Sequence, residues 1–178
     1  MPSRDLWSHG SGRQLPDLVS SVLIALLLRR DDPRPAYFCS PWITQFSVGS
    51  NAFDKFLPLF PDLSGHYEIP FATYLVRLAR DRVVRLVTTD KQPSRDFLAT
   101  PALRAAVEIR IAEDGFHEKG ILAPGFYLEG SMNLTHNGVH VNGEKITYHV
   151  AGDPEGEERL ARAYLEFNRH WERLERHG

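Results

Sequence analysis

Residues 117–133 read HEKGILAPGFYLEGSMN, two short apolar runs joined by Pro124-Gly125. A Pro-Gly pair between apolar runs is a turn signal, so the segment predicts a hairpin of two strands, residues 119–123 and 126–129. The end of the second strand then lies beside the start of the first. We therefore expect the polar residues that flank the two runs to meet at one place.

The sequence around this hairpin alternates between helix-like and strand-like segments. Apolar and β-branched runs predict further strands at 36–39, 83–88, 107–111 and 145–150. Apolar spacing and end signals predict helices at 15–30, 70–80, 94–106 (interrupted at Pro101) and 154–176. Residues 45–65 have no clean period and are predicted to be a surface excursion. The alternation predicts an α/β fold in which the sheet is at least partly parallel.

Composition limits the classes of protein that the chain can be. Its 178 residues, 42% of them hydrophobic, suit one globular domain over residues 1–178, with residues 1–14 expected to be a loose N-terminal segment. A formal charge of −2 excludes a basic coat over the whole surface, so any polyanion site must be local. Cys39, the single cysteine, excludes an internal disulfide and is expected to be buried and inert.

The longest apolar stretch, residues 18–28, is shorter than the roughly 20 residues that span a bilayer. The N-terminus lacks the layout of a secretory signal, and a cytoplasmic location is expected. The helix at 15–30 is apolar around most of its surface, which predicts burial within the chain or against a partner. In the last helix an apolar stripe is expected to pack on the chain's own sheet rather than in a coiled coil; it consists of Leu160, Tyr164, Phe167, Trp171 and Leu174.

The polar residues around the hairpin form a chemical set. His117 and Lys119 are two residues apart, so in a strand they are expected to point the same way, and the hairpin brings Ser131 and Asn133 toward the same spot. Taken singly, each has an ordinary structural alternative, such as a helix cap for Asn133. Together they offer an imidazole, an ammonium, a hydroxyl and an amide, which suit a phosphodiester reaction.

His117-x-Lys119 followed by Gly130-Ser131-x-Asn133 resembles the signature of the phospholipase D superfamily. Glu144 resembles the acidic position of its small bacterial nucleases, with a solvated turn carboxylate as the alternative. Pro124 stands where the superfamily has an aspartate, and the interval from His117 to Gly130 is one residue short. Within the superfamily the segment is most similar to the phospholipase-D-like protein of bacterial 7-deazaguanine DNA modification and restriction clusters.

This resemblance implies a phospholipase-D-like α-β-α sandwich with a mixed sheet flanked by helices. It also implies a homodimer, because one His-x-Lys is half a site, and a phosphohistidine formed on His117. Lys119 and Asn133 would hold the phosphoryl oxygens, Ser131 would add a hydrogen bond, and Glu144 would orient a His117 imidazole of one subunit or the other. No cofactor or metal is expected, and His136 and His140 are interpreted as structural or surface residues.

The implied function is a metal-independent phosphodiesterase, a nuclease acting on DNA in a modification, restriction or defence system. The implied partners are DNA, either 7-deazaguanine-modified or its unmodified counterpart, a second copy of the chain, and other proteins of the same cluster, with no membrane. A lipid phosphodiesterase or phosphatidyl transferase of the superfamily and a catalytically weak nucleic-acid-binding scaffold are the alternatives. Four arginines close in sequence are a candidate phosphate-contacting patch, with an ordinary solvated surface as the alternative: Arg77, Arg80, Arg82 and Arg85.

Overall fold

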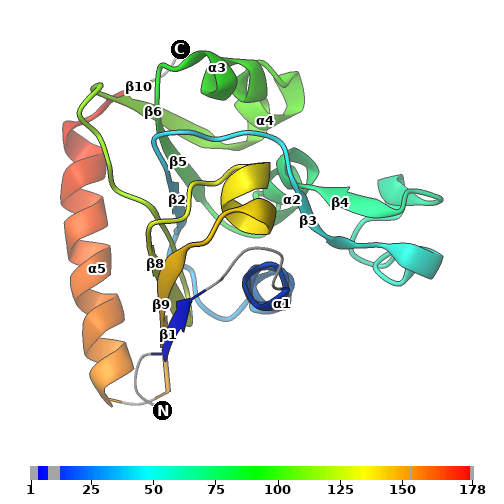
Figure 1. Cartoon of the computed structure of the whole chain (residues 1–178), viewed down its shortest axis with the longest axis horizontal. Helices are drawn as coiled ribbons and strands as arrows, with labels where there is room; N and C mark the ends of the chain where they lie inside the picture. The colour runs from blue at the N-terminus through cyan, green and yellow to red at the C-terminus, as the bar shows by residue number, and fades with distance from the viewer. Residues whose placement is uncertain (1–3, 8–12, 153, 177–178) are drawn as a thin grey trace.

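The computed structural model describes residues 4–7, 13–152 and 154–176, shown in Figure 1 as a sheet with helices on both sides and a projecting arm. The sheet and its helices comprise β1 (Arg4–Trp7), α1 (Gln14–Leu28), β2 (Ala36–Cys39), α2 (Phe71–Leu78), β5 (Val84–Thr89), α3 (Gln92–Leu98), α4 (Pro101–Ala106), β6 (Glu108–Ala112), β7 (Gly120–Ala123), β8 (Phe126–Gly130), β9 (Lys145–Val150), α5 (Pro154–Arg173) and β10 (Glu175–Arg176). The arm and connections add β3 (Ser47–Ser50), β4 (Glu68–Pro70), two 3₁₀ helices, η1 (Ala52–Asp54) and η2 (Pro61–Leu63), and a π-helix, η3 (Asn137–Val141).

The main sheet has eight strands in the order β1-β9-β8-β7-β2-β5-β6-β10. β2, β5 and β6 run parallel, because α2 and the pair α3–α4 lie on the connections between them. β7, β8 and β9 continue the sheet in antiparallel fashion. The predicted α/β sandwich with a mixed sheet is confirmed.

α5 covers one face of this sheet (Figure 1). Its buried side chains include Leu160, Tyr164, Phe167 and Trp171, at spacings of four, three and four. The rings of Phe167 and Trp171 lie with their centroids 5.5 and 6.2 Å from that of Tyr37 on β2, in edge-on contact. The prediction that the C-terminal stripe packs on the chain's own sheet is confirmed.

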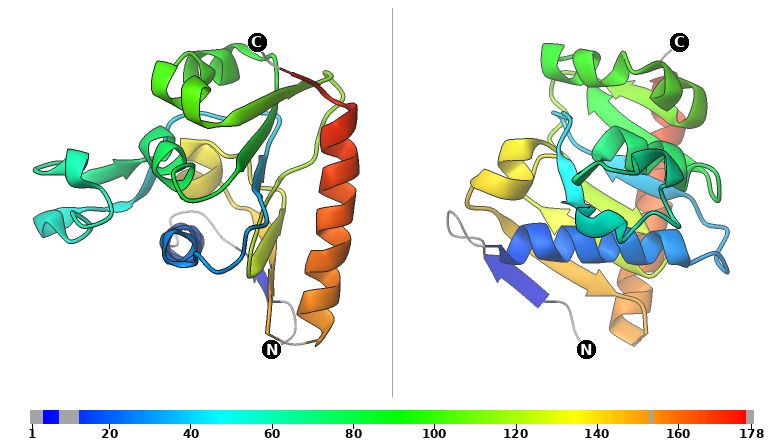
Figure 2. Two further views of the ribbon diagram at one scale, coloured as in Figure 1. Left: turned by 180° about the vertical axis from the view of Figure 1, so that it is seen from behind. Right: turned by 90° about the vertical axis from the view of Figure 1, so that its right-hand side faces the viewer.

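α1, α2, α3 and α4 lie on the opposite face (Figure 2). α1 buries Leu15, Val19, Val22, Leu23, Leu26 and Leu27. At its centre the hydroxyl of Tyr74, from α2, donates to the Leu23 carbonyl at 2.8 Å. Full burial of one such aliphatic side chain contributes roughly 1.5–3 kcal/mol, so the packing of α1 stabilises this layer strongly. The helix is buried within the chain itself, and its last residue, Leu28, is exposed.

The arm, formed by β3, β4 and the loop between them, projects away from the sheet (Figure 2). One buried side chain, Asn51, organises the loop. Its amide donates to the carbonyls of Leu63 and His66 at 3.1 and 3.0 Å and accepts from the Phe56 N–H at 3.1 Å. The predicted surface excursion is thus an ordered loop in which Asn51 makes three hydrogen bonds. Such bonds leave no apolar period in the sequence.

Two edge strands differ from the predictions. Arg4–Trp7 pairs with β9, so the prediction of a loose N-terminal segment is wrong for these residues, while residues 1–3 and 8–12 lie outside the described residues. The last helix ends at Arg173 rather than 176, because Glu175–Arg176 pairs with β6. Both additions cover sheet edges whose backbone groups would otherwise need other partners. No helix in the described part of the chain is long and apolar enough to cross a membrane.

Candidate active site

The register of the sheet brings the segments that carry the predicted site residues to the same end of the central strands. Cys39 at the end of β2 pairs with Gly120 at the start of β7, Gly120 pairs with Glu129, and Gly130 pairs with Ile146 near the start of β9. The segments that precede or follow these strand ends therefore lie next to one another. We call this region the polar edge; it consists of Ser40, His117, Lys119, Ser131, Asn133 and Glu144.

Ser131 and Glu144 form a fixed pair in the polar edge. The Ser131 hydroxyl donates to the Glu144 carboxylate and accepts from the Lys145 N–H at 3.0 Å. The Ser131 N–H donates in turn to the Lys145 carbonyl at 3.0 Å. Glu144 is only 8% exposed, so it is not a solvated turn carboxylate. The pair can hold a hydroxyl in place beside a substrate oxygen.

Ser40, which the sequence did not assign to the site, lies beside Asn133. The Ser40 hydroxyl is fully buried, accepts from the Leu134 N–H at 3.1 Å and lies 3.3 Å from Asn133 Oδ1. Gly138 of η3 packs so closely that an added Cβ would lie 2.2 Å from the Asn133 carbonyl oxygen. The signal for Ser40 was its place directly after a buried strand, where polar side chains of α/β sheets gather.

His117 and Lys119 lie in the segment before β7, because that strand begins at Gly120 rather than at 119. His117 is exposed, and the Lys119 ammonium donates to the His117 carbonyl at 2.9 Å. Among residues 4–7, 13–152 and 154–176, none forms a side-chain hydrogen bond with the His117 imidazole. A solvent-exposed imidazole is able to act on a bound phosphodiester as nucleophile or acid.

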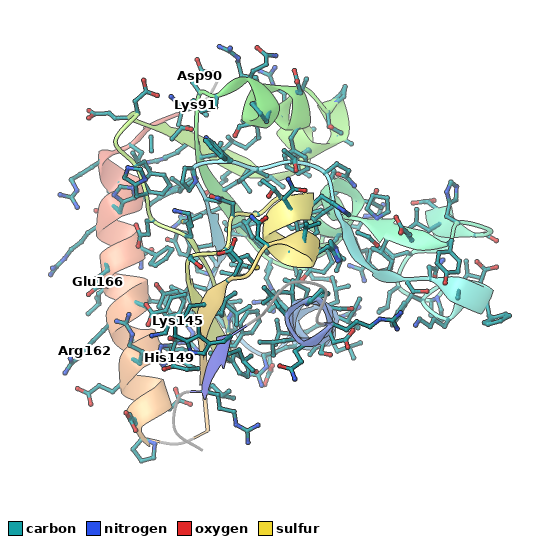
Figure 3. All side chains as sticks on the ribbon, viewed as in Figure 1. Asp90, Lys91, Lys145, His149, Arg162 and Glu166 are labelled. Atoms are coloured by element: carbon teal, nitrogen blue, oxygen red, sulfur yellow. The ribbon has the colours of Figure 1, made fainter. Side chains whose placement is uncertain are left out.

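Two carboxyl groups near His117, those of Glu118 and Glu129, have shifted pKa values. The pKa of Glu118, between the histidine and the lysine, is raised by burial and by the carboxylates of Glu166 and Glu129. Burial opposes the ionisation of Glu129, but hydrogen bonds from Arg159 and His149 outweigh it and lower the pKa of Glu129. Figure 3 shows His149 on β9 beside α5, which carries Glu166. The two carboxyl groups are therefore shifted in opposite directions, Glu118 by burial and like charge and Glu129 by its hydrogen bonds.

Pro124 lies far from these groups. It sits in the β7–β8 turn after Ala123, at the end of the hairpin opposite to the polar edge. The hairpin register is continuous from Ala123↔Phe126 to Gly120↔Glu129, so the ladder is unbroken between the turn and the polar edge. The departure from the aspartate pattern is thus a feature of the turn.

The arginine prediction needs correction, because these side chains surround the start of β5, at the opposite ends of the strands. Arg82 is buried, and its guanidinium donates to the carbonyls of Arg29, Asp32 and Arg34. Arg85 binds Glu108 and the Tyr37 hydroxyl. Arg77 binds Asp81 at 2.6 Å and the Leu59 carbonyl, and Arg80 lies 3.9 Å from Asp62. We call these four residues the arginine edge; Arg77, Arg82 and Arg85 bind groups of the chain itself, whereas Arg80 is exposed.

Cys39 and the histidine pair His136 and His140 lie outside the polar edge as it is defined above. Cys39 is buried, and burial raises the pKa of its thiol, which confirms the inert interpretation. His140 Nε2 lies 3.0 Å from the Ser47 carbonyl oxygen, and its ring centroid is 5.1 Å from that of His136. In the described part of the chain no three histidine, cysteine or acidic side chains are grouped as metal ligands.

No protein-family model and no curated protein matches the chain by sequence. Solved structures do match. Nuc from Salmonella typhimurium, a phospholipase D family member, aligns at a TM-score of 0.53 and 16% identity over 98% of this chain and 97% of that one. NucT from Helicobacter pylori aligns at 0.58 and 11% over 98% and 99%. Phosphatidylserine synthase from Haemophilus influenzae aligns at 0.59 and 16% over 98% of this chain and 40% of that one.

At these low identities, the structural matches show a shared fold alone. The mixed sheet flanked by helices is that of a phospholipase D family member along nearly the full length of both chains. The expected phospholipase-D-like α-β-α sandwich is confirmed at the level of architecture.

Proposed function

We propose that the chain is a metal-independent phosphodiesterase that cleaves nucleic acid, with His117 as the nucleophile. The observation that supports this proposal is the strand register, which brings the segments carrying His117, Lys119 and the Ser131–Glu144 pair to the same end of neighbouring strands. An amide, Asn133, lies beside them on a buried serine. The architecture shared with Nuc supports the same reading.

The reaction needs two histidines, and the chain offers one His-x-Lys. In our proposal a second copy, related by a two-fold axis, brings its own His117 to the polar edge. One imidazole attacks phosphorus and forms a P–N bond as the P–O bond to the leaving group breaks. The other imidazole protonates the leaving oxygen, then takes a proton from water, which attacks phosphorus and breaks the P–N bond.

The remaining groups stabilise charge in this scheme. Lys119 and Asn133 bind the non-bridging oxygens, and the Ser131 hydroxyl adds a hydrogen bond where negative charge develops. Glu144 positions Ser131 through their hydrogen bond, and in the dimer it orients a His117 imidazole of one subunit or the other. The lysine and histidine charges would then do the electrostatic work that Mg²⁺ does elsewhere.

DNA is the proposed substrate. The sequence resembles the phospholipase-D-like component of 7-deazaguanine DNA modification clusters, and the fold also occurs in TrmBL2, an archaeal chromatin protein that binds DNA. We propose a role in modification, restriction or defence, with other proteins of such a cluster as partners. The likeness to phosphatidylserine synthase makes a phosphatidyl substrate the second candidate, and a catalytically weak scaffold is the third.

The test measures cleavage of plain DNA, 7-deazaguanine-containing DNA and phosphatidylglycerol vesicles in excess EDTA. Wild type is compared with His117→Ala and with His66→Ala, which removes an exposed histidine of the arm. We expect DNA cleavage that survives EDTA, vanishes in His117→Ala and persists in His66→Ala. Cleavage abolished by EDTA, or turnover of vesicles alone, would contradict the proposal, and no cleavage of any substrate by a folded dimer would favour the scaffold.

A further inference from the structure

A cavity of about 300 Å³ opens directly beside Asn133. It lies between the segment after β2, the start of α3 and η3, the yellow helix in Figure 1. Its volume is at the lower end of small-ligand pockets, roughly 300–1,000 Å³. The side chains that define its chemistry are Trp42, Thr44, Asn133, His136, Asn137 and Asn142.

Trp42 is presented to this cavity on a fixed backbone. The Trp42 carbonyl accepts from the Ser40 hydroxyl at 2.7 Å, the next N–H, of Ile43, donates to Ser94, and the following one, of Thr44, donates to Leu134. The indole itself is 53% exposed, and no aromatic ring or cation of a described residue packs on it. A rigidly mounted, exposed indole is a stacking surface.

The walls of the cavity are mostly apolar in area, with hydroxyl and amide groups set among them. Among the described residues, no carboxylate, lysine or arginine side chain lines it. An acyl chain would leave the amide and hydroxyl groups of this lining without hydrogen-bond partners, and a phosphate favours a cation such as the ammonium of Lys119, which does not line the cavity. Amide groups opposite an indole suit a planar, neutral ligand with hydrogen-bonding edges and a π-face, which describes a nucleobase.

We propose that this cavity binds the unpaired nucleobase next to the scissile phosphodiester, stacked on Trp42, so that the substrate class is single-stranded nucleic acid. The inference rests on the proposed function, because Asn133 belongs both to the polar edge and to the cavity wall. A base that remains paired within a duplex cannot enter a recess of this kind, whereas an unpaired base can.

The test measures binding, by fluorescence anisotropy in EDTA, in a His117→Ala background that does not consume the ligand. The probes are a single-stranded oligonucleotide, the same strand with every base removed, and the corresponding duplex. We expect the base-containing strand to bind about ten-fold more tightly than the abasic strand. Trp42→Ala should abolish this difference, Trp42→Phe should retain part of it, and Tyr67→Ala, which removes an exposed aromatic of the arm, should leave it unchanged.

Equal affinity for base-containing and abasic strands, preference for duplex, or a difference that survives Trp42→Ala would overturn the inference. The failure of this inference is distinguishable from failure of the proposed function. If the protein with His117 intact cleaves DNA equally well with and without Trp42→Ala, the phosphodiesterase proposal stands and the base subsite does not. Trp42-dependent binding of bases without any cleavage would retain the subsite and remove the reaction.

Discussion

The two ends of the β-strands are both rich in polar side chains, yet they are built in opposite ways. At the arginine edge the guanidinium of Arg82 is buried and bound by three backbone carbonyls, and that of Arg85 is bound by Glu108 and Tyr37. At the polar edge His117 is exposed to solvent. Charged residues that lie close together in the sequence do not by themselves locate a ligand site, because the chain can bind those charges itself.

The largest expected effect concerns the lysine of the polar edge. Removing a charge-stabilising donor costs about 10²–10³ in rate, so Lys119→Ala should lower kcat/KM for DNA by at least about 100-fold. The matched control is Lys91→Ala. Lys91 lies at the start of α3 (Figure 3) and pairs with Asp114 at 2.7 Å, so its loss should change kcat/KM by less than about three-fold. Equal losses in the two variants would show that the edge acts only through diffuse charge.

The second effect concerns the stability of the opposite edge. Arg82→Ala leaves three carbonyls without their buried donor and should lower the free energy of unfolding by about 2–3 kcal/mol in urea titrations. Arg80→Ala, at an exposed ion pair, should cost less than about 0.5 kcal/mol. Activity per folded molecule should stay unchanged in both variants. Weaker DNA binding by Arg82→Ala at unchanged stability would restore the phosphate-patch hypothesis.

A third effect tests the support of Asn133. In Gly138→Ala the added methyl would meet the backbone of Asn133 at 2.2 Å, so the amide must move. Because misplacement by about 1 Å can cost about 100-fold in rate, we expect at least a ten-fold loss of kcat. Gly115→Ala, where an added Cβ meets nothing within 4 Å, is the control. Full activity in Gly138→Ala would show that Asn133 does not need this position.

The smallest expected effect is a pH-dependent change in stability. Because the pKa of Glu118 is raised, its carboxyl group binds a proton more tightly in the folded chain than in the unfolded chain. Ionisation of Glu118 at neutral pH therefore opposes folding. Glu118→Gln should therefore raise Tm by about 1–2 °C at pH 7 and leave it unchanged near pH 4. Glu129→Gln should do the reverse at pH 7, because the pKa of Glu129 is lowered. Shifts of the same sign would contradict this account.

Much of the fold could be predicted from local patterns. The strand at Ala36–Cys39, the β7–β8 turn and the break between α3 and α4 at Pro101 each carry a periodicity or a turn residue that acts within a few positions. β1 and β10 were missed because each is a short edge strand, and its pairing with a distant strand leaves no periodic signal. The arm was missed in detail because Asn51, a single polar residue, organises it.

The candidate site was predictable as a set of residues but not as a set of contacts. The hairpin alone predicts that the segments carrying Lys119 and Ser131 lie at the same end of the two strands, because strand pairing fixes that register. The bond between Ser131 and Glu144, the buried Ser40 and the position of Trp42 depend on which side chains the loops bury. The arginine prediction met the same limit, since proximity in sequence does not reveal the acceptors that folding supplies to Arg77, Arg82 and Arg85.

The stereochemistry of cleavage at phosphorus tests the central claim most directly. A phosphorothioate diester of defined configuration is cleaved in oxygen-18 water by the wild-type protein in EDTA, and the configuration of the product is determined. Attack by His117 followed by attack of water is two in-line displacements, each with inversion, so we predict overall retention. Overall inversion would mean that water attacks phosphorus directly, and would contradict a covalent intermediate on His117.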